Sequence, residues 1–172
     1  PRYREVKETQ IPEVSLKSGV KVKVICGNVN GVDGPVRDIV TDPEYLDVAV
    51  PARTDFQYTV KPGHTVFAYV IEGKAYFDPD RNSYAHEVVG TTYFDLEREG
   101  MFGPGSLILY HREGDRMIIA TEEIPVRFLL VSGKPIGEPV AWYGPIVMNT
   151  QEELREAFEE FNNGTFIKSK KH

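Results

Sequence analysis

Val66-Phe67-Ala68-Tyr69-Val70-Ile71-Glu72-Gly73-Lys74-Ala75-Tyr76-Phe77 is the stretch that decides the fold. Its branched and aromatic side chains favour extended backbone, because they fit a pleated, half-buried sheet. Glu72-Gly73 interrupts the apolar run at the point where a glycine supplies the backbone angles of a tight turn. The sequence therefore predicts a hairpin with strands at residues 65–71 and 74–77.

Short strands are predicted on both sides of this hairpin. At residues 20–26, valines alternate with lysines, which places the valines on one face of a half-buried strand. Turn-forming Gly, Pro, Asp or Asn residues bound the other segments. Those segments are 46–50, 56–60, 91–96, 106–110, 116–120 and 126–131. Many short strands with no helix between them predict an all-β fold, an antiparallel sandwich or barrel.

One helix is predicted near the C-terminus. Thr150-Gln151-Glu152-Glu153 has the form of a capping box, in which the threonine and the glutamate three residues later satisfy free N–H groups. Apolar side chains then recur with helical spacing, and Gly164 is a natural stop. The apolar stripe consists of Leu154, Ala157, Phe158 and Phe161. We expect a barrel over residues 1–148 and a helix and tail over residues 149–172. We expect the helix to be buried against the barrel or a partner domain through Leu154, Phe158 and Phe161.

Composition narrows the class of partner. The chain has 172 residues, with 20 Lys plus Arg against 26 Asp plus Glu, and a formal net charge of −6. A nucleic-acid surface would carry a basic excess, so direct nucleic-acid binding is disfavoured. No apolar run approaches the length of a membrane span. A single cysteine, Cys26, cannot form an internal disulfide, which fits a reducing, cytoplasmic setting.

Few residues of the sequence are candidates for catalysis or metal binding. The four histidines are His64, His86, His111 and His172, and none has a His or Cys neighbour at a metal-ligand spacing. His64 and His111 flank predicted strands and are the weak candidates for metal ligands if a site exists. The sequence offers no serine-hydrolase elbow and no phosphate-binding glycine loop. We expect Cys26 to be a small core residue, and we assign no catalytic, cofactor-binding or metal-binding residue.

Several segments resemble one known family. Gly133-Lys134-Pro135-Ile136-Gly137-Glu138-Pro139-Val140 and Gly144-Pro145-Ile146-Val147-Met148-Asn149-Thr150 are similar to motifs of the pirin family. The runs at 114–120 and 128–133 and the first residues of the chain extend the likeness over essentially the whole sequence. The chain resembles the C-terminal cupin domain of pirins only.

The resemblance implies a double-stranded β-helix, the cupin fold. It also implies a second, N-terminal barrel that holds the family's iron through three histidines and a glutamate. In a metal-binding cupin, a glutamate lies seven residues before the turn glycine, and counting from Gly73 places Val66 there. The matching histidine positions fall near Lys61 and Pro62, and none of these residues binds iron. The resemblance therefore implies no cofactor in this chain and iron in the N-terminal domain of the family.

Three functions follow from the resemblance and stay open. The first is a metal-free structural or regulatory barrel, whose partner is an N-terminal cupin domain of the same protein or of another copy. The second is an iron-dependent enzyme similar to quercetin 2,3-dioxygenase, in which a degenerate site coordinates the metal, although this chain alone offers at most His64 and His111 as ligands. The third is a transcription co-regulator that acts through protein contacts. An acidic chain agrees with protein contact, and it agrees equally with many other roles.

Overall fold

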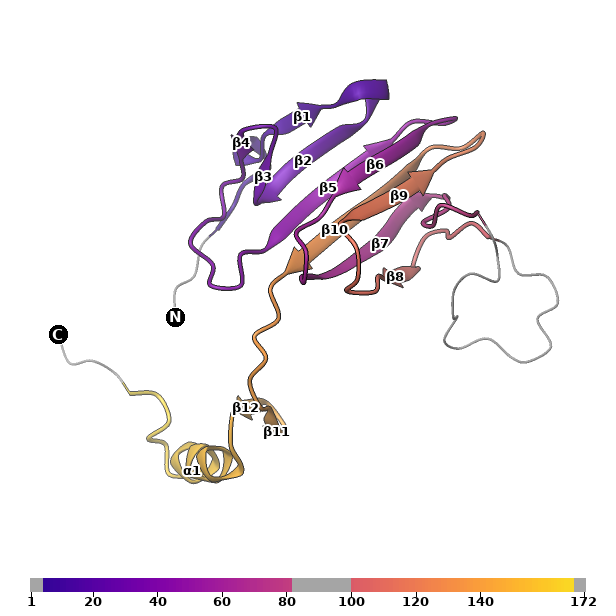
Figure 1. The fold of residues 1–172 in the computed structure, drawn as a ribbon. Coiled ribbons are helices and arrows are strands. Elements are labelled where there is room, and N and C mark those ends of the chain that lie inside the picture. The colour runs from indigo at the N-terminus through magenta and orange to yellow at the C-terminus, as the bar shows by residue number, and fades with distance from the viewer. Residues whose placement is uncertain (1–4, 82–99, 169–172) are drawn as a thin grey trace, which may run out of the picture. The chain divides into compact units, whose positions relative to one another are not determined.

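A computed structural model describes residues 5–81 and 100–168 (Figure 1). Contacts divide the chain into two compact units, Pro1–Pro135 and Ile136–His172. The first unit contains strands β1 to β10, and the second contains β11, β12 and the helix α1. The predicted strand at 91–96 lies outside the described residues.

The first unit is built from short strands. They are β1 Glu13–Ser15, β2 Lys21–Cys26, β3 Asn28–Val29, β4 Val32–Asp33, β5 Glu44–Val50, β6 Asp55–Thr59, β7 Thr65–Gly73, β8 Leu107–Leu109, β9 Arg116–Ala120 and β10 Val126–Gly133. Two 3-10 turns, Glu8–Gln10 and Lys17–Gly19, precede β1 and β2. The predicted strands at 20–26, 46–50, 56–60, 106–110, 116–120 and 126–131 are confirmed within a residue or two at their ends.

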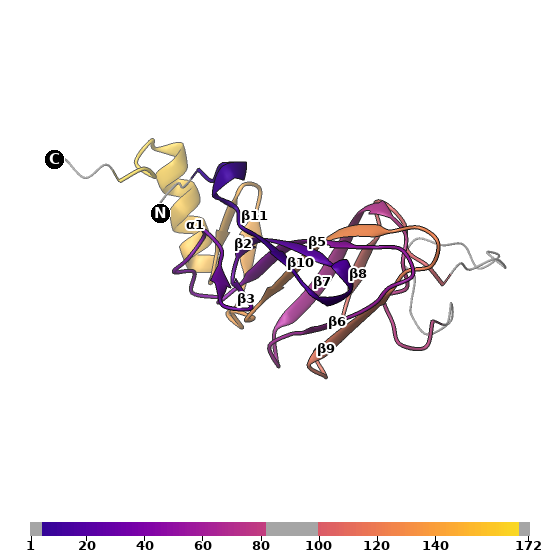
Figure 2. The ribbon, with the colours of Figure 1, turned by 90° about the horizontal axis from the view of Figure 1, so that it is seen from above.

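The strands form an antiparallel sandwich. The larger sheet has the order β1-β2-β5-β10-β7-β8, and β6 pairs with β9 in a separate two-stranded sheet. Every pairing in the larger sheet is antiparallel. Figure 2 shows β6 and β9 lying to one side of the larger sheet. The predicted fold class, an all-β antiparallel sandwich or barrel with one C-terminal helix, is confirmed.

The prediction that residues 65–71 and 74–77 pair as a hairpin is wrong. Strand β7 continues to Gly73 and pairs with β10 and β8, not with the residues that follow it. Beyond Gly73, Ala75 bridges Phe102 and Tyr76 bridges Ala120 of β9. Gly73 has a φ of 71°, which turns the chain out of the larger sheet. Residues 74–77 therefore cross toward the smaller sheet and help to close the sandwich.

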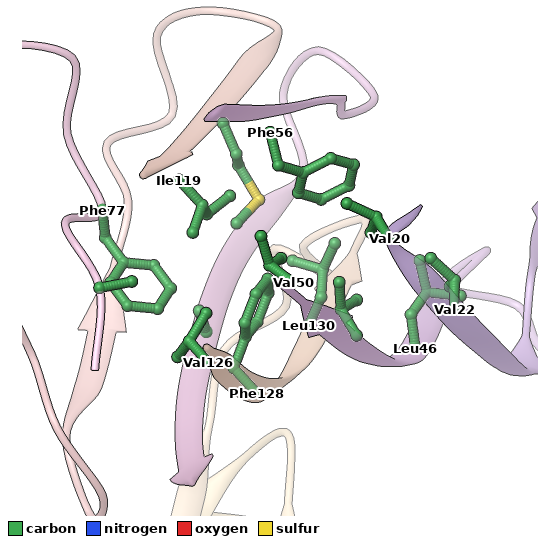
Figure 3. Packing of buried hydrophobic residues seen from close by; sticks show 14 of the residues in the cluster. Val20, Val22, Leu46, Val50, Phe56, Phe77, Ile119, Val126, Phe128 and Leu130 are labelled. Carbon is green, nitrogen blue, oxygen red and sulfur yellow. The ribbon is translucent and has the colours of Figure 1, made fainter. Parts of the chain in front are cut away.

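The core lies between the two sheets. Alternate residues of β2, β5, β7 and β10 point inward and are buried, and β6 and β9 cover them from the other side (Figure 3). The ring of Phe77 packs edge-on against Phe128, with centroids 5.3 Å apart. Cys26 is buried, and its thiol donates to the carbonyl of Pro43 at 3.4 Å, so the prediction of a core cysteine is confirmed.

The second unit has a small core of its own. Strands β11 (Ala141–Tyr143) and β12 (Ile146–Met148) form a hairpin, and α1 (Gln151–Asn162) packs on it. Thr150 caps the helix, and Thr150 and Glu153 form the predicted capping box. The buried residues are Ala141, Ile146, Leu154 and Ala157. The hairpin thus groups with the helix, and the compact units separate at Pro135, ahead of the predicted division at 148.

Replacement of Gly73 by alanine should destabilise the first unit strongly. A Cβ atom there would overlap the carbonyl of Pro125, in addition to the unfavourable positive φ. The left-handed backbone costs about 1–2 kcal/mol and overpacking about 1–3 kcal/mol, so we expect a loss of about 2–5 kcal/mol in the free energy of unfolding. Urea denaturation of Gly73→Ala measures it.

Gly105→Ala is the matched control. Gly105 also has a positive φ, 85°, but a Cβ atom there would meet nothing within 4 Å. The Gly105→Ala variant should lose only the free energy of unfolding that the left-handed backbone costs, about 1–2 kcal/mol. Equal losses in the two variants would contradict the overlap at Pro125.

Candidate functional site

Strand register gathers polar residues at one end of the sandwich. Glu44 begins β5 and pairs with Ser132 near the end of β10, while Thr65 begins β7 opposite Gly133. Strand β8 ends at Leu109, opposite Phe67 of β7, so Tyr110 follows at the same end. The residues that gather here are Glu44, Tyr58, His64, Tyr110 and Ser132, and we call this group the polar end.

A buried carboxylate anchors the polar end. Glu44 is only 6% exposed. The hydroxyls of Tyr58 and Ser132 donate to its two carboxylate oxygens, each at 3.2 Å. A buried carboxylate is costly unless it is hydrogen-bonded, and these two donors satisfy it. Burial, with the nearby charge of Glu44 and the hydrogen bond to it, raises the pKa of Tyr58 well above its ordinary value.

Sequence reasoning missed this network. Glu44 precedes the segment predicted as a strand, and nothing in the sequence marks it as buried. The only sign of a buried network was a polar residue at a strand position that faces the core. That residue lies opposite Ser132. Reading it requires the pairing of β5 with β10, which the sequence does not state.

His64 and His111 line one pocket of about 160 Å³. His64 lies just before β7 and is only 8% exposed, whereas His111 lies on the surface. The structure therefore brings the two weak ligand candidates to the same place. The remaining histidines of the sequence, His86 and His172, lie outside the described residues.

The pocket does not supply a ligand set for iron. Val66, which falls at the glutamate position of metal-binding cupins, lines it with an apolar side chain, as does Met117. Lys61, near the histidine positions, also lines it and is paired with Asp42 at 2.6 Å. Within residues 5–81 and 100–168, no three His, Cys, Asp or Glu side chains are grouped to hold a metal ion. Stable iron binding needs several converging nitrogen or oxygen donors, which these residues do not fit.

An apolar patch covers part of the outer face of the larger sheet, over β5, β10, β7 and β8. Phe67 and Tyr69 alternate with buried residues of β7, so their side chains face outward. The register places Leu109 beside Phe67 and Leu107 beside Tyr69. Cross-strand neighbours on β10 and β5 extend the surface. This outer patch consists of Tyr45, Phe67, Tyr69, Leu107, Leu109, Leu129 and Val131.

The side chains predicted to form an interface on the helix differ in exposure. Leu154 is buried within the second unit, in the cluster with Ala141 and Ile146. Phe158 is half-buried, and its ring lies 5.2 Å from that of Tyr143. Phe161 is 56% exposed. Of the three residues, Phe161 offers the most free surface to a partner, and their role in an interface stays a prediction.

The fold and the pocket together define a cupin-type barrel. A crystal structure of quercetin 2,3-dioxygenase from Acinetobacter baumannii is similar to it, with a TM-score of 0.74 and 25% sequence identity. The similarity covers 96% of this chain and 50% of that protein.

The chain belongs to the pirin family. The family described as the Pirin C-terminal cupin domain matches residues 45–167. Pirin-1 of Arabidopsis thaliana is 36% identical over 164 residues, which are 95% of this chain and 51% of that protein. Pirin of Rattus norvegicus is 34% identical over 165 residues, 95% of this chain and 50% of the rat protein. The chain thus spans about half the length of these relatives. Among the described residues, no helix has the length and apolar character needed to cross a membrane.

The buried phenols should resist ionisation. The pKa values of Tyr58 and Tyr110 are both raised, chiefly by burial. A group whose pKa is higher in the folded state adds stability below its unfolded pKa, which is about 10 for tyrosine, and that stability is lost as the pH rises beyond it. We expect these two phenols to ionise only at higher pH, together with unfolding, in a titration followed by phenolate absorbance and circular dichroism.

Two variants show which tyrosine contributes to the late step in phenolate absorbance. Tyr58→Phe should remove absorbance from the late, unfolding-coupled step, whereas Tyr143→Phe, at an exposed tyrosine, should leave that step intact. Loss of the late amplitude in Tyr143→Phe and its retention in Tyr58→Phe would contradict the burial of the Tyr58 hydroxyl.

Proposed function

We propose that this chain is the metal-free second barrel of a two-barrel pirin, and that it packs against an iron-binding first barrel. Membership of the Pirin C-terminal domain family supports the assignment to the second barrel. The chain covers about half of its relatives, which leaves room for a barrel of similar size. The single cysteine supports a reducing, cytoplasmic setting as part of this proposal.

The proposal is supported most directly by the apolar side chains in the wall of the pocket. An iron-binding cupin needs donor side chains where this chain has Val66, and the neighbouring Met117 adds a second apolar surface. Within the described residues, the donors that line this pocket, His64, His111 and Glu113, are not grouped to hold a metal ion. The chemistry of the whole protein is therefore assigned to the other barrel, and the role of this one is to support it.

The outer patch is the surface proposed to contact the first barrel. Leu107 is 60% exposed and Leu109 is 64% exposed, on the edge strand of the larger sheet. On the same outer face, Leu129 and Val131 of β10 continue the apolar surface from the edge toward the middle of the sheet. Side chains of this kind gain free energy when they are removed from water, about 25 cal/mol per Å². Contiguous exposed apolar surface is typical of a binding face.

Dioxygenase activity is the second candidate function. The likeness to the Acinetobacter baumannii quercetin 2,3-dioxygenase favours it for the whole protein. Since this chain matches half of that structure, the proposal places the reaction in the other half. The co-regulator role implied by the family resemblance stays a prediction.

Without its first barrel, this chain should associate through the outer patch. We expect light scattering to show a concentration-dependent dimer, because two copies bury the patch against each other. Leu109→Glu places a charge within that contact and should weaken dimerisation at least tenfold, about 1.4 kcal/mol or more.

Val40→Glu is the control, because Val40 is 97% exposed and lies in the loop before β5. It should leave the dimer unchanged. A monomer at every concentration, or equal weakening by the two variants, would count against the outer patch as a docking face.

A further inference from the structure

Two residues that line the pocket at the polar end each carry a buried polar atom without a partner among the described residues, and Asp78 Oδ2 is a third such atom. The Nδ1 atom of His64 and the hydroxyl of Tyr110 are shielded from solvent, and neither makes a hydrogen bond within the described part of the chain. Both residues line the same pocket. An unsatisfied buried donor or acceptor costs about 1–3 kcal/mol, so such atoms call for a bound partner.

The two atoms are suited to bind an acceptor oxygen. Burial and the nearby Asp78 raise the pKa of Tyr110, so its hydroxyl keeps its proton and can donate. Asp78 itself lies outside the pocket lining. The imidazole of His64 donates from Nδ1 when that nitrogen carries the proton. A ligand that presents an oxygen between them would satisfy both.

The mouth of the pocket is basic although the chain is acidic. Lys61, Arg112 and Arg116 line it, and Glu113 is the acidic side chain among its lining residues in the described part of the chain. Lys61 is paired with Asp42 at 2.6 Å. Arg116 is paired with Asp115 at 3.4 Å.

Among the described residues, Arg112 is a cation of this mouth without an ion-pair partner, unlike Lys61 and Arg116. Within residues 5–81 and 100–168 it makes no ion pair and no hydrogen bond. A guanidinium presents parallel N–H donors that match a carboxylate in two-point fashion. Because the net charge of the chain is −6, a free arginine over a pocket of donors is a specific feature and not part of a generally basic surface.

The pocket floor limits the size and character of the ligand. Val60, Val66 and Met117 line it with apolar side chains. Its volume of about 160 Å³ is small beside the roughly 300–1,000 Å³ of pockets that bind drug-sized ligands. It therefore accommodates a charged head and a chain of only a few carbons.

We propose that this pocket binds a small aliphatic carboxylate. The carboxylate accepts hydrogen bonds from Tyr110 and His64 and pairs with Arg112, while its short chain lies on Val66 and Met117. The site is independent of the role proposed for the outer patch.

The test uses propionate as the probe, with the full 172-residue chain and NMR detection of the His64 ring. We expect saturable shifts with a Kd of about 1 mM, which is reasonable for a ligand of this size. Propionamide, which has the same shape without the charge, should bind at least tenfold more weakly. Inorganic phosphate distinguishes a general oxyanion site from a carboxylate site, and tighter binding of phosphate would overturn the carboxylate assignment.

Variants locate the binding site. Arg112→Gln changes an exposed side chain and should weaken propionate binding at least about tenfold, as loss of a charged hydrogen bond does. Tyr110→Phe removes only the hydroxyl and should weaken it in the same direction. Arg53→Gln, at an arginine paired with Glu123 outside the pocket, is the control and should leave the Kd unchanged.

Three results would overturn the proposal. One is the absence of saturable shifts with propionate. Another is a Kd that stays within twofold in Arg112→Gln while the circular dichroism spectrum shows an intact fold. The third is saturable Zn²⁺ binding at His64 that propionate does not displace, which would assign the pocket to a metal.

Discussion

The pairing of β10 with β5 on one side and β7 on the other is the constraint on which the rest of the structure depends. It sets which residues face the core, because a slip of one residue would turn every inward side chain outward. Phe128 and Leu130, at the centre of β10, are both fully buried in this register. The same register places Ser132 opposite Glu44 and thereby creates the polar end.

The one register also separates two kinds of surface. Inward positions near the end of the sandwich carry Glu44, Ser132 and the pocket of His64, which are suited to hydrogen bonding in a shielded place. Outward positions of the same strands carry the outer patch, which is suited to contact with another apolar face. Strand β10 contributes to both, with Ser132 inside and Val131 outside. The proposed ligand site and the proposed docking face therefore do not compete for residues.

Local features could be predicted from the sequence, and pairings could not. The alternation at 20–26 and the capping box at Thr150 are set by neighbouring residues, and both are confirmed. Gly73 is recognisable as a turn residue, but the close approach of the Pro125 carbonyl, which leaves no room for a Cβ atom, comes from a segment distant in sequence. The partner of Glu44 and the burial of the Tyr110 hydroxyl depend on strand register in the same way, so periodicity alone did not reveal them.

Within the described residues, the interior of this barrel does not fit iron, and an anaerobic calorimetric titration of the chain with Fe²⁺ is the direct test. The account predicts only weak, non-saturating heats, unchanged in His64→Ala, because Val66 and Met117 provide no ligand atoms suited to Fe²⁺. Binding of one Fe²⁺ per chain that disappears in His64→Ala would contradict it.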